Sequence, residues 1–194
     1  MFGGSPPAKN ETELWNGTNW TEQNNLGTAR SDATGAGSQP SALMSGGYDG
    51  SSVVASVEQW TGAGANIGAW STGGNLNTGR RSAGGAGTQT AALIYGGDLD
   101  PGVNALTESY NGSSWTEVND LNLARSVIGG GNMTQTSALA ISGQPPASRT
   151  ETELWNGSNW TEVNDLNTPR NNLAGAAADN TLGLAFGGYS GSPP

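Results

Sequence analysis

Short apolar segments that end at glycine recur along the chain, separated by polar stretches rich in turn-forming residues. Four of them match closely: SALMSGG at 41–47, AALIYGG at 91–97, SALAISG at 137–143 and LGLAFGG at 182–188. Runs this short, with alternating polar neighbours and glycine at one end, are typical of β-strands. Since no apolar run approaches the roughly 20 residues that cross a bilayer, the pattern predicts no membrane span.

The apolar strand belongs to a repeated unit of four strands, which we call a, b, c and d. Each unit begins at an arginine that follows an Asn-Leu or Asp-Leu pair, and consecutive arginines are 50, 45 and 45 residues apart. A glycine- and alanine-rich strand a comes next, then the apolar strand b, an acidic-aromatic strand c and a tryptophan-led strand d. Asn-Gly joins strands c and d in three units, a sequence that favours tight hairpin turns. The positions are 35–37, 85–87, 129–131 and 175–177 for strand a, 12–15, 56–60, 107–110 and 152–155 for strand c, and 20–26, 70–76, 115–121 and 160–166 for strand d.

An aromatic pair flanks each turn between strands c and d, and we expect these pairs to pack between neighbouring units. A four-stranded unit repeated at this period cannot bury its faces alone, so the units must stack. A propeller is the usual closed arrangement of such antiparallel units. The sequence therefore predicts an all-β chain that forms a β-propeller of four-stranded antiparallel blades. The aromatic pairs are Trp15/Trp20, Trp60/Trp70, Tyr110/Trp115 and Trp155/Trp160.

The order of these motifs resembles the kelch repeat. The segment 81–118, with RSAGGAGTQTAALIYGG and TESYNGSSWTEV, is the most similar, and the resemblance extends over almost the whole chain. The third unit departs from the pattern, with Gly143-Gln144 in place of a glycine pair. Phrases such as NGSSWTEVNDLN are also similar to kelch-like repeats of marine bacteriophage proteins, some of which are virion- or tail-associated. The resemblance implies a kelch-like propeller whose strand a lies innermost, where small residues suit a tight ring.

The two ends of the chain predict how the ring closes. Phe2-Gly3-Gly4 repeats Phe186-Gly187-Gly188, so the start of the chain supplies strands c and d of one blade and the end supplies its strands a and b. Two strands from each end would remove exposed sheet edges. We favour a four-bladed ring closed within one chain, hence a monomer; the alternative is a half-ring that closes as an eight-bladed homodimer by exchanging its ends. We expect a single domain, 1–194, with blades at about 30–78, 80–124 and 125–169 and a composite blade of 170–188 with 5–29.

Composition narrows the function. The 194 residues carry a net charge of −9, which disfavours duplex nucleic acid and anionic membranes as partners. There is no Cys and no His, which removes thiolate nucleophiles, Cys-ligated zinc and the commonest general base. We therefore expect no enzyme, no cofactor and no metal. The first residues, MFGGSPP, lack the basic start and the apolar core of a signal peptide, and the location of the protein stays open.

The four repeated arginines are the first candidates for a site. Arg30, Arg80, Arg125 and Arg170 would lie at the start of strand a, as a ring around one mouth of the axis. Guanidinium groups bind carboxylates in a bidentate way, so such a ring could hold an anion. We favour the alternative that each arginine pairs with a carboxylate of a nearby blade. A residue with a structural role is expected in every unit, whereas a binding site usually needs only some of the units. The candidate partners are Glu13, Glu58, Glu108 and Glu153.

The loops between strands b and c differ most among the units, and variable loops on a rigid scaffold commonly carry binding sites. They leave the sheets on the same face as the connections from strand d to strand a. A carbohydrate could bind there through polar groups and an aromatic platform; neutral variation of the loops is the alternative. The loops span 48–55, 98–105, 144–151 and a seam of 189–194 with 5–10, and the candidate residues are Tyr48, Asp49, Asp98, Asp100 and Tyr189.

These observations favour a non-catalytic binding or structural module. Its most concrete form is a phage-derived domain that recognises a surface glycan or a partner protein. The alternatives are a purely architectural repeat segment of a larger fibre or virion protein and, least favoured, a glycan-active enzyme. An enzyme that cleaves glycosides needs two carboxylates across a cleft, whereas the glutamates here recur in strand c and suggest a structural role.

Overall fold

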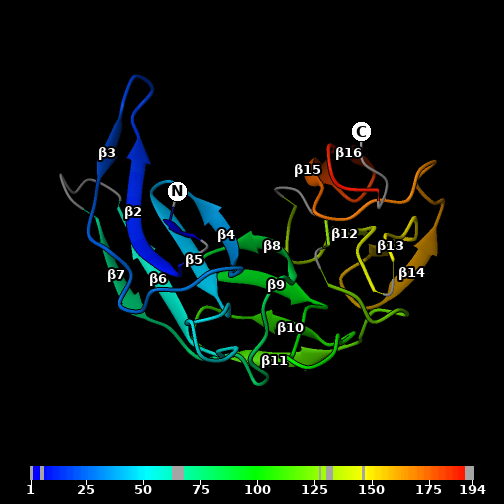
Figure 1. The fold of residues 1–194 in the computed structure, drawn as a ribbon, viewed down its shortest axis with the longest axis horizontal. Coiled ribbons are helices and arrows are strands. Elements are labelled where there is room, and N and C mark those ends of the chain that lie inside the picture. The colour runs from blue at the N-terminus through cyan, green and yellow to red at the C-terminus, as the bar shows by residue number, and fades with distance from the viewer. Residues whose placement is uncertain are drawn as a thin grey trace.

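The computed structural model describes residues 2–4, 7–62, 68–126, 128–129, 133–145 and 147–190, which contain strands and connecting loops (Figure 1). The strands pair in antiparallel sheets that follow one another along an open arc. The predicted all-β class is confirmed. None of the described residues belongs to a helix that could cross a membrane.

Two of the described sheets have four strands in sequence order, as the repeat predicts, and the others have two or three. The four-stranded sheets are β4 (Thr34–Ser38), β5 (Ser41–Ser45), β6 (Val57–Thr61) and β7 (Ala69–Thr72), and β8 (Gly84–Thr88), β9 (Ala91–Tyr95), β10 (Thr107–Tyr110) and β11 (Trp115–Val118). The third unit forms β12 (Ala138–Ile141), β13 (Thr152–Trp155) and β14 (Trp160–Val163). Its strand a falls partly on Gly130 and Gly131, which lie outside the described residues.

The composite blade expected from 170–188 and 5–29 is not formed within the chain. At one end of the arc, β15 (Ala174–Asp179) pairs with β16 (Leu182–Phe186) alone. At the other end, β2 (Lys9–Trp15) lies between β1 (Phe2–Gly4) and β3 (Trp20–Glu22). Figure 1 shows the opening of the arc between these two sheets. The structure thus differs from a four-bladed ring closed within one chain. Each interface between two consecutive sheets, which we call a joint, turns the chain too little for its ends to meet.

Strands a of neighbouring sheets approach one another closely, which explains their glycine and alanine content. A Cβ added at Gly85 of β8 would lie 2.3 Å from Cγ2 of Thr34 on β4, nearer than any side chain tolerates. The hydroxyl of Thr34 also donates to the carbonyl oxygen of Ala83 across this joint, at 3.0 Å. The small residues of strand a therefore decide how closely consecutive sheets pack.

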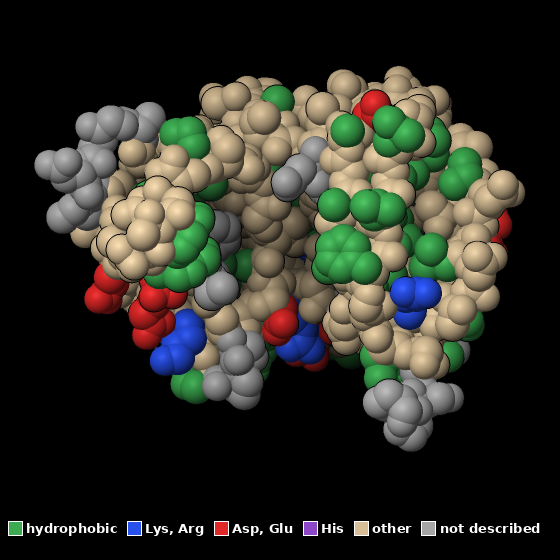
Figure 2. Space-filling model, turned by 90° about the horizontal axis from the view of Figure 1, so that it is seen from above, with side chains coloured by type: hydrophobic (Ala, Val, Ile, Leu, Met, Phe, Trp, Pro, Cys, Tyr) green, Lys and Arg blue, Asp and Glu red, His purple; other side chains and the backbone are tan. Residues whose placement is uncertain are grey.

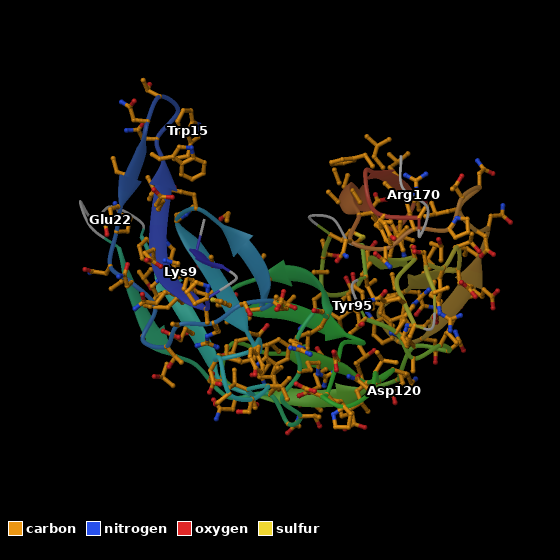
Figure 3. All side chains as sticks on the ribbon, viewed as in Figure 1. Lys9, Trp15, Glu22, Tyr95, Asp120 and Arg170 are labelled. Carbon is orange, nitrogen blue, oxygen red and sulfur yellow. The ribbon has the colours of Figure 1, made fainter. Side chains whose placement is uncertain are left out.

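The core lies between consecutive sheets and is built from the apolar residues of strand b and from the aromatic pairs. Leu93, Tyr95 and Trp160 are buried in one cluster, and the rings of Tyr95 and Trp160 from neighbouring sheets lie 4.8 Å apart. At the ends of the arc the equivalent side chains reach the surface, and Figure 2 shows hydrophobic side chains on both sides of the opening. In Figure 3, Tyr95 lies within the series of sheets, whereas Trp15 and Arg170 lie at its two ends.

Candidate functional site

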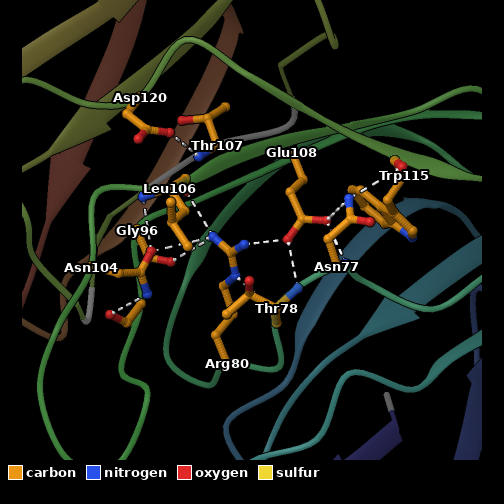
Figure 4. Close-up of polar contacts among 11 residues, drawn as sticks. Asn77, Thr78, Arg80, Gly96, Asn104, Leu106, Thr107, Glu108, Trp115 and Asp120 are labelled. Carbon is orange, nitrogen blue, oxygen red and sulfur yellow. Dashed lines mark hydrogen bonds and ion pairs between the residues drawn. The ribbon is translucent and has the colours of Figure 1, made fainter.

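Arg80 lies just before β8, on the connection between two sheets, and protein atoms surround its guanidinium (Figure 4). Its Nη2 forms an ion pair with Glu108 of β10, and its Nη1 donates to the carbonyl oxygen of Leu106 at 2.7 Å. Glu108 also accepts hydrogen bonds from the backbone N–H of Asn77 at 2.8 Å and from its side-chain amide at 2.9 Å. The side chains of Arg80 and Glu108 are 0% and 1% exposed, so solvent does not reach this ion pair.

Two other units repeat the arrangement. Arg30 pairs with Glu58, and Nη2 of Arg125 lies 2.9 Å from Oε1 of Glu153; in both cases the carboxylate comes 28 residues after the arginine. Burial lowers the pKa of Arg125 below its ordinary value, and the negative charge of Glu153 opposes that shift. In each of these pairs the arginine and the glutamate belong to the same unit, so the expected partner from a nearby blade was wrong. The ion pair ties the segment before strand a to strand c of the same unit, and a dissolved anion has no access to these arginines.

The fourth repeated arginine, Arg170, has only part of this environment. Its Nη1 donates to the carbonyl oxygen of Gly187 at 3.2 Å, as Nη1 of Arg30 does to that of Gly46 at the same distance. Within the described parts of the chain, Arg170 forms no ion pair. Its candidate partner Glu13 lies on β2, in the sheet at the opposite end of the arc.

A polar cluster on the loops joins two neighbouring sheets. The guanidinium of Arg81 lies over the ring of Tyr48, 5.1 Å from its centroid. Nη2 of Arg81 lies 3.3 Å from Oδ2 of Asp98 and 3.6 Å from Oδ2 of Asp100. Tyr48 follows β5, and the two aspartates follow β9. The structure therefore brings three of the five loop candidates together, with Arg81 between them.

Arg81 is not among the residues that the sequence predicts for a site. It directly follows Arg80, and only Arg80 recurs in every unit. At the position of Arg81 the other units carry Ser31, Ser126 and Asn171, and each of these bridges to the residue that follows strand b in its own unit. A charged residue that departs from the repeat at a position beside a variable loop was the available signal.

The other two loop candidates have different surroundings. Oδ1 of Asp49 accepts hydrogen bonds from the N–H groups of Ser52 at 2.9 Å and Ser51 at 2.8 Å, and these bonds, that of Ser52 first, lower the pKa of Asp49. Its carboxylate thus stabilises its own turn. Tyr189 follows β16, where its backbone bridges to Asn171 and its side chain is exposed. Tyr189 is therefore not part of the Arg81 cluster, and residues 5–6 and 191–194 of the predicted seam lie outside the described residues.

The chemistry available at the loop cluster is two carboxylates, one guanidinium and one aromatic ring. In the described ranges, no group of three or more His, Cys, Asp or Glu side chains is arranged to hold a metal ion. No protein-family model matches the chain, and no curated protein matches it either.

Proposed function

We propose that the chain is a non-catalytic binding module on a kelch-like β-propeller scaffold. Repetition of one plan supports this architecture: antiparallel strands in sequence order, closely packed strands a, and a buried ion pair at the connections. Because Glu108 binds both Arg80 and the backbone N–H of Asn77, its carboxylate holds the connection from the preceding blade in place. A scaffold built in this way keeps its loops at a fixed spacing.

The recognition surface that we propose is the loop cluster of Tyr48, Arg81, Asp98 and Asp100. This cluster carries the proposal, because it joins the loops of two blades into one polar surface beside an aromatic ring. The side chain of Asp100 is 49% exposed, so its carboxylate can accept hydrogen bonds from a ligand. Aspartate and arginine can bind the hydroxyl groups of a sugar, and the tyrosine ring provides an apolar edge.

The charge of the protein limits the class of ligand. A net charge of −9 repels polyanions, and both aspartates of the cluster add to that repulsion. A neutral surface glycan fits the cluster best, and a partner protein with exposed hydroxyl and amide groups is the other candidate. The similarity to phage repeats suggests a virion- or tail-associated protein that recognises a cell surface.

A glycan array with the 194-residue chain tests the proposal. We expect binding to a subset of neutral glycans, and a roughly tenfold or larger loss of affinity for Asp98→Ala, since a hydrogen bond to a charged group contributes about 1.5–3 kcal/mol. Glu117→Gln is the matched control, because it removes one negative charge from the exposed side of β11 and should leave binding unchanged. Thermal unfolding of both variants verifies that they are folded. An array without binding, or full binding by Asp98→Ala, would contradict glycan recognition at this cluster.

An architectural role is the second candidate, and the exposed apolar side chains at the two ends of the arc favour it. Such surfaces suit assembly with other protein surfaces. Assembly through the ends without any glycan binding would favour the architectural function. We assign no catalytic role to the chain.

A further inference from the structure

The ends of the arc expose apolar side chains whose equivalents in the other units are buried. Leu184 of β16 is 69% exposed, whereas Leu93, at the same position of β9, is 2% exposed. Trp15 of β2 is 47% exposed, whereas Trp60, at the same position of β6, is 4% exposed. Large apolar side chains gathered on a surface are typical of an interaction site. Each end of the arc therefore carries a surface suited to a protein partner.

At the N-terminal end this surface is a groove of about 480 Å³ between β2 and β4. Leu14, Trp15 and Trp20 line one side of the groove, and Ala36 and Trp60 line the other. At the next joint along the arc, the corresponding space between β6 and β8 is taken by β5, whose leucine is fully buried there. The groove thus has the position and the lining of a site for a strand b.

The short strand β1 occupies one end of that site. Phe2 pairs with Thr12 of β2 in the register that β9 adopts on β10. The N–H of Gly4 donates to the carbonyl oxygen of Arg30 at 3.2 Å. At the equivalent place after β9, the N–H of Gly97 donates to the carbonyl oxygen of Arg125 at 2.8 Å. The sequence of β1, Phe-Gly-Gly, is also that of 186–188 at the end of β16. A strand with the sequence of β16 could therefore replace β1 and continue along the rest of β2.

The polar groups of the two ends are complementary as well. Arg170 already binds the carbonyl oxygen of Gly187, and a carboxylate from a strand c would complete the environment that surrounds Arg80. Glu13 of β2 is the strand c glutamate at the position of Glu108. The C-terminal end thus carries the arginine of this ion pair, and the N-terminal end carries its carboxylate.

The tryptophans of strand d give a second polar match. Nε1 of Trp160 donates to Oγ1 of Thr107 in the preceding sheet at 3.0 Å, and Nε1 of Trp70 donates to Oγ1 of Thr12 at 2.9 Å. Thr152 holds the equivalent place in β13, before the C-terminal end. At the next joint, the hydroxyl of Thr152 would accept from the indole N–H of a strand d tryptophan such as Trp20.

We propose that a second copy of the chain closes the ring. In each copy β15 and β16 join β2 and β3 of the other copy and displace β1, so that two half-rings form one eight-bladed propeller. Leu184 then pairs with Leu14, and Arg170 with Glu13, of the opposite copy. A second copy fits because every copy offers both surfaces at opposite ends of one arc, and two copies make both contacts at once (Figure 1). The inference rests on the proposed propeller architecture and is independent of the ligand.

Light scattering with paired variants tests both the assembly and its direction. We expect a molar mass near twice 19.6 kDa for the 194-residue chain. Leu184→Asp and Trp15→Asp should each be monomeric, because each places a carboxylate in both joints. An equimolar mixture of the two should form a one-to-one dimer, since one joint between them has two unchanged surfaces. Leu99→Asp is the control, because it changes a partly buried loop residue away from both ends and should leave the dimer intact.

A cysteine pair separates closure between two chains from closure within one. The sequence has no Cys, so Leu182→Cys with Asn16→Cys introduces two thiols into a chain without others. Ser41 and Thr61, at the equivalent positions of β5 and β6, are paired. After oxidation we expect cross-linked chains of twice the mass in a denaturing gel without reductant. A cross-link within a single chain would overturn the proposal.

Removal of residues 1–4 tests the exchange itself. Because β1 competes with β16 for one edge of β2, the shortened chain should dimerise at least as tightly as the full chain. Loss of the dimer on this deletion, a monomeric full chain, or variants that do not associate when mixed would each overturn the proposal. Polymers that lengthen with protein concentration would show that the ends join without closing, which also overturns it. Glycan binding by a monomer would leave the recognition proposal standing.

Discussion

The buried ion pair of Arg80 and Glu108 allows a direct test of what holds the connection between two neighbouring sheets in place. Glu108→Gln keeps the shape of the side chain and removes its charge. The guanidinium of Arg80 would then stay buried without a counter-charge. The new amide group would also meet the N–H groups of Asn77 and Thr78, which now donate to the carboxylate, and a glutamine offers them fewer acceptor sites.

The loss of unfolding free energy that we expect for Glu108→Gln lies in the upper range for variants that remove one partner of a buried ion pair. Removing one partner of a buried ion pair costs about 3–5 kcal/mol. Since the Glu108 carboxylate accepts from Asn77, Thr78 and Arg80 together, we expect Glu108→Gln to lose about 4–5 kcal/mol of unfolding free energy. Glu58→Gln should lose less, because the Glu58 side chain is 10% exposed and accepts from fewer donors.

Urea unfolding followed by tryptophan fluorescence and circular dichroism measures these losses, at one protein concentration because association adds to apparent stability. Glu162→Gln, at an exposed position of β14 in the next unit, is the control and should change stability by less than about 0.5 kcal/mol. Arg80→Met with Glu108→Leu should be more stable than Glu108→Gln, because no unpaired charge stays buried. A loss below about 1 kcal/mol for Glu108→Gln, or a double variant less stable than the single one, would refute the reasoning.

Two further predictions concern buried polar atoms. Burial raises the pKa of Tyr95 above its ordinary value, with Arg125 opposing the shift, so the folded state keeps the phenol protonated. The stability that this provides is full below the unfolded pKa of about 10 and is lost as the pH rises above it. Unfolding measured across alkaline pH should therefore show a weaker loss of unfolding free energy for Tyr95→Phe than for the unchanged chain. An equal loss would contradict a buried, protonated Tyr95. Nε1 of Trp115 is buried and has no hydrogen-bond partner in the described structure, and Val57 holds the place at which Thr107 accepts from the equivalent tryptophan. Val57→Thr would give this N–H an acceptor and should stabilise the chain by up to about 1 kcal/mol. Thr107→Val would remove the acceptor of Trp160 and should cost about 1–3 kcal/mol, both measured by thermal unfolding. Changes in stability of the opposite sign would show that the two positions are not equivalent.

Much of the local structure could be predicted from the sequence because it depends on neighbouring residues. The Asn-Gly turns and the alternating apolar positions define strands b, c and d, and the structure confirms an all-β chain of antiparallel sheets. Repetition also singled out the arginines and the strand c glutamates. The loop cluster was harder to predict, because Arg81 acts through residues of two different loops and occurs in one unit alone.

Closure of the ring was the expectation that failed within the chain. The match of Phe2-Gly3-Gly4 to 186–188 gives the register in which the ends can join. It does not say whether the same chain or another supplies the missing strands. That depends on the turn at each joint, where a contact such as Gly85 against Thr34 sets the distance between strands a. Small differences in such contacts add up over several joints, and a local sequence pattern does not record their sum.

The sequence by itself therefore determined the class of fold, the order of strands in the repeat and the pairs of strands that can complete one another. These properties follow from turn chemistry and from the alternation of apolar residues, which act over a few positions. The tertiary structure alone decided the open arc, the burial of Arg80 with Glu108 and the meeting of Tyr48, Arg81 and Asp98. Those properties depend on packing between sheets, where residues far apart in the sequence share one joint.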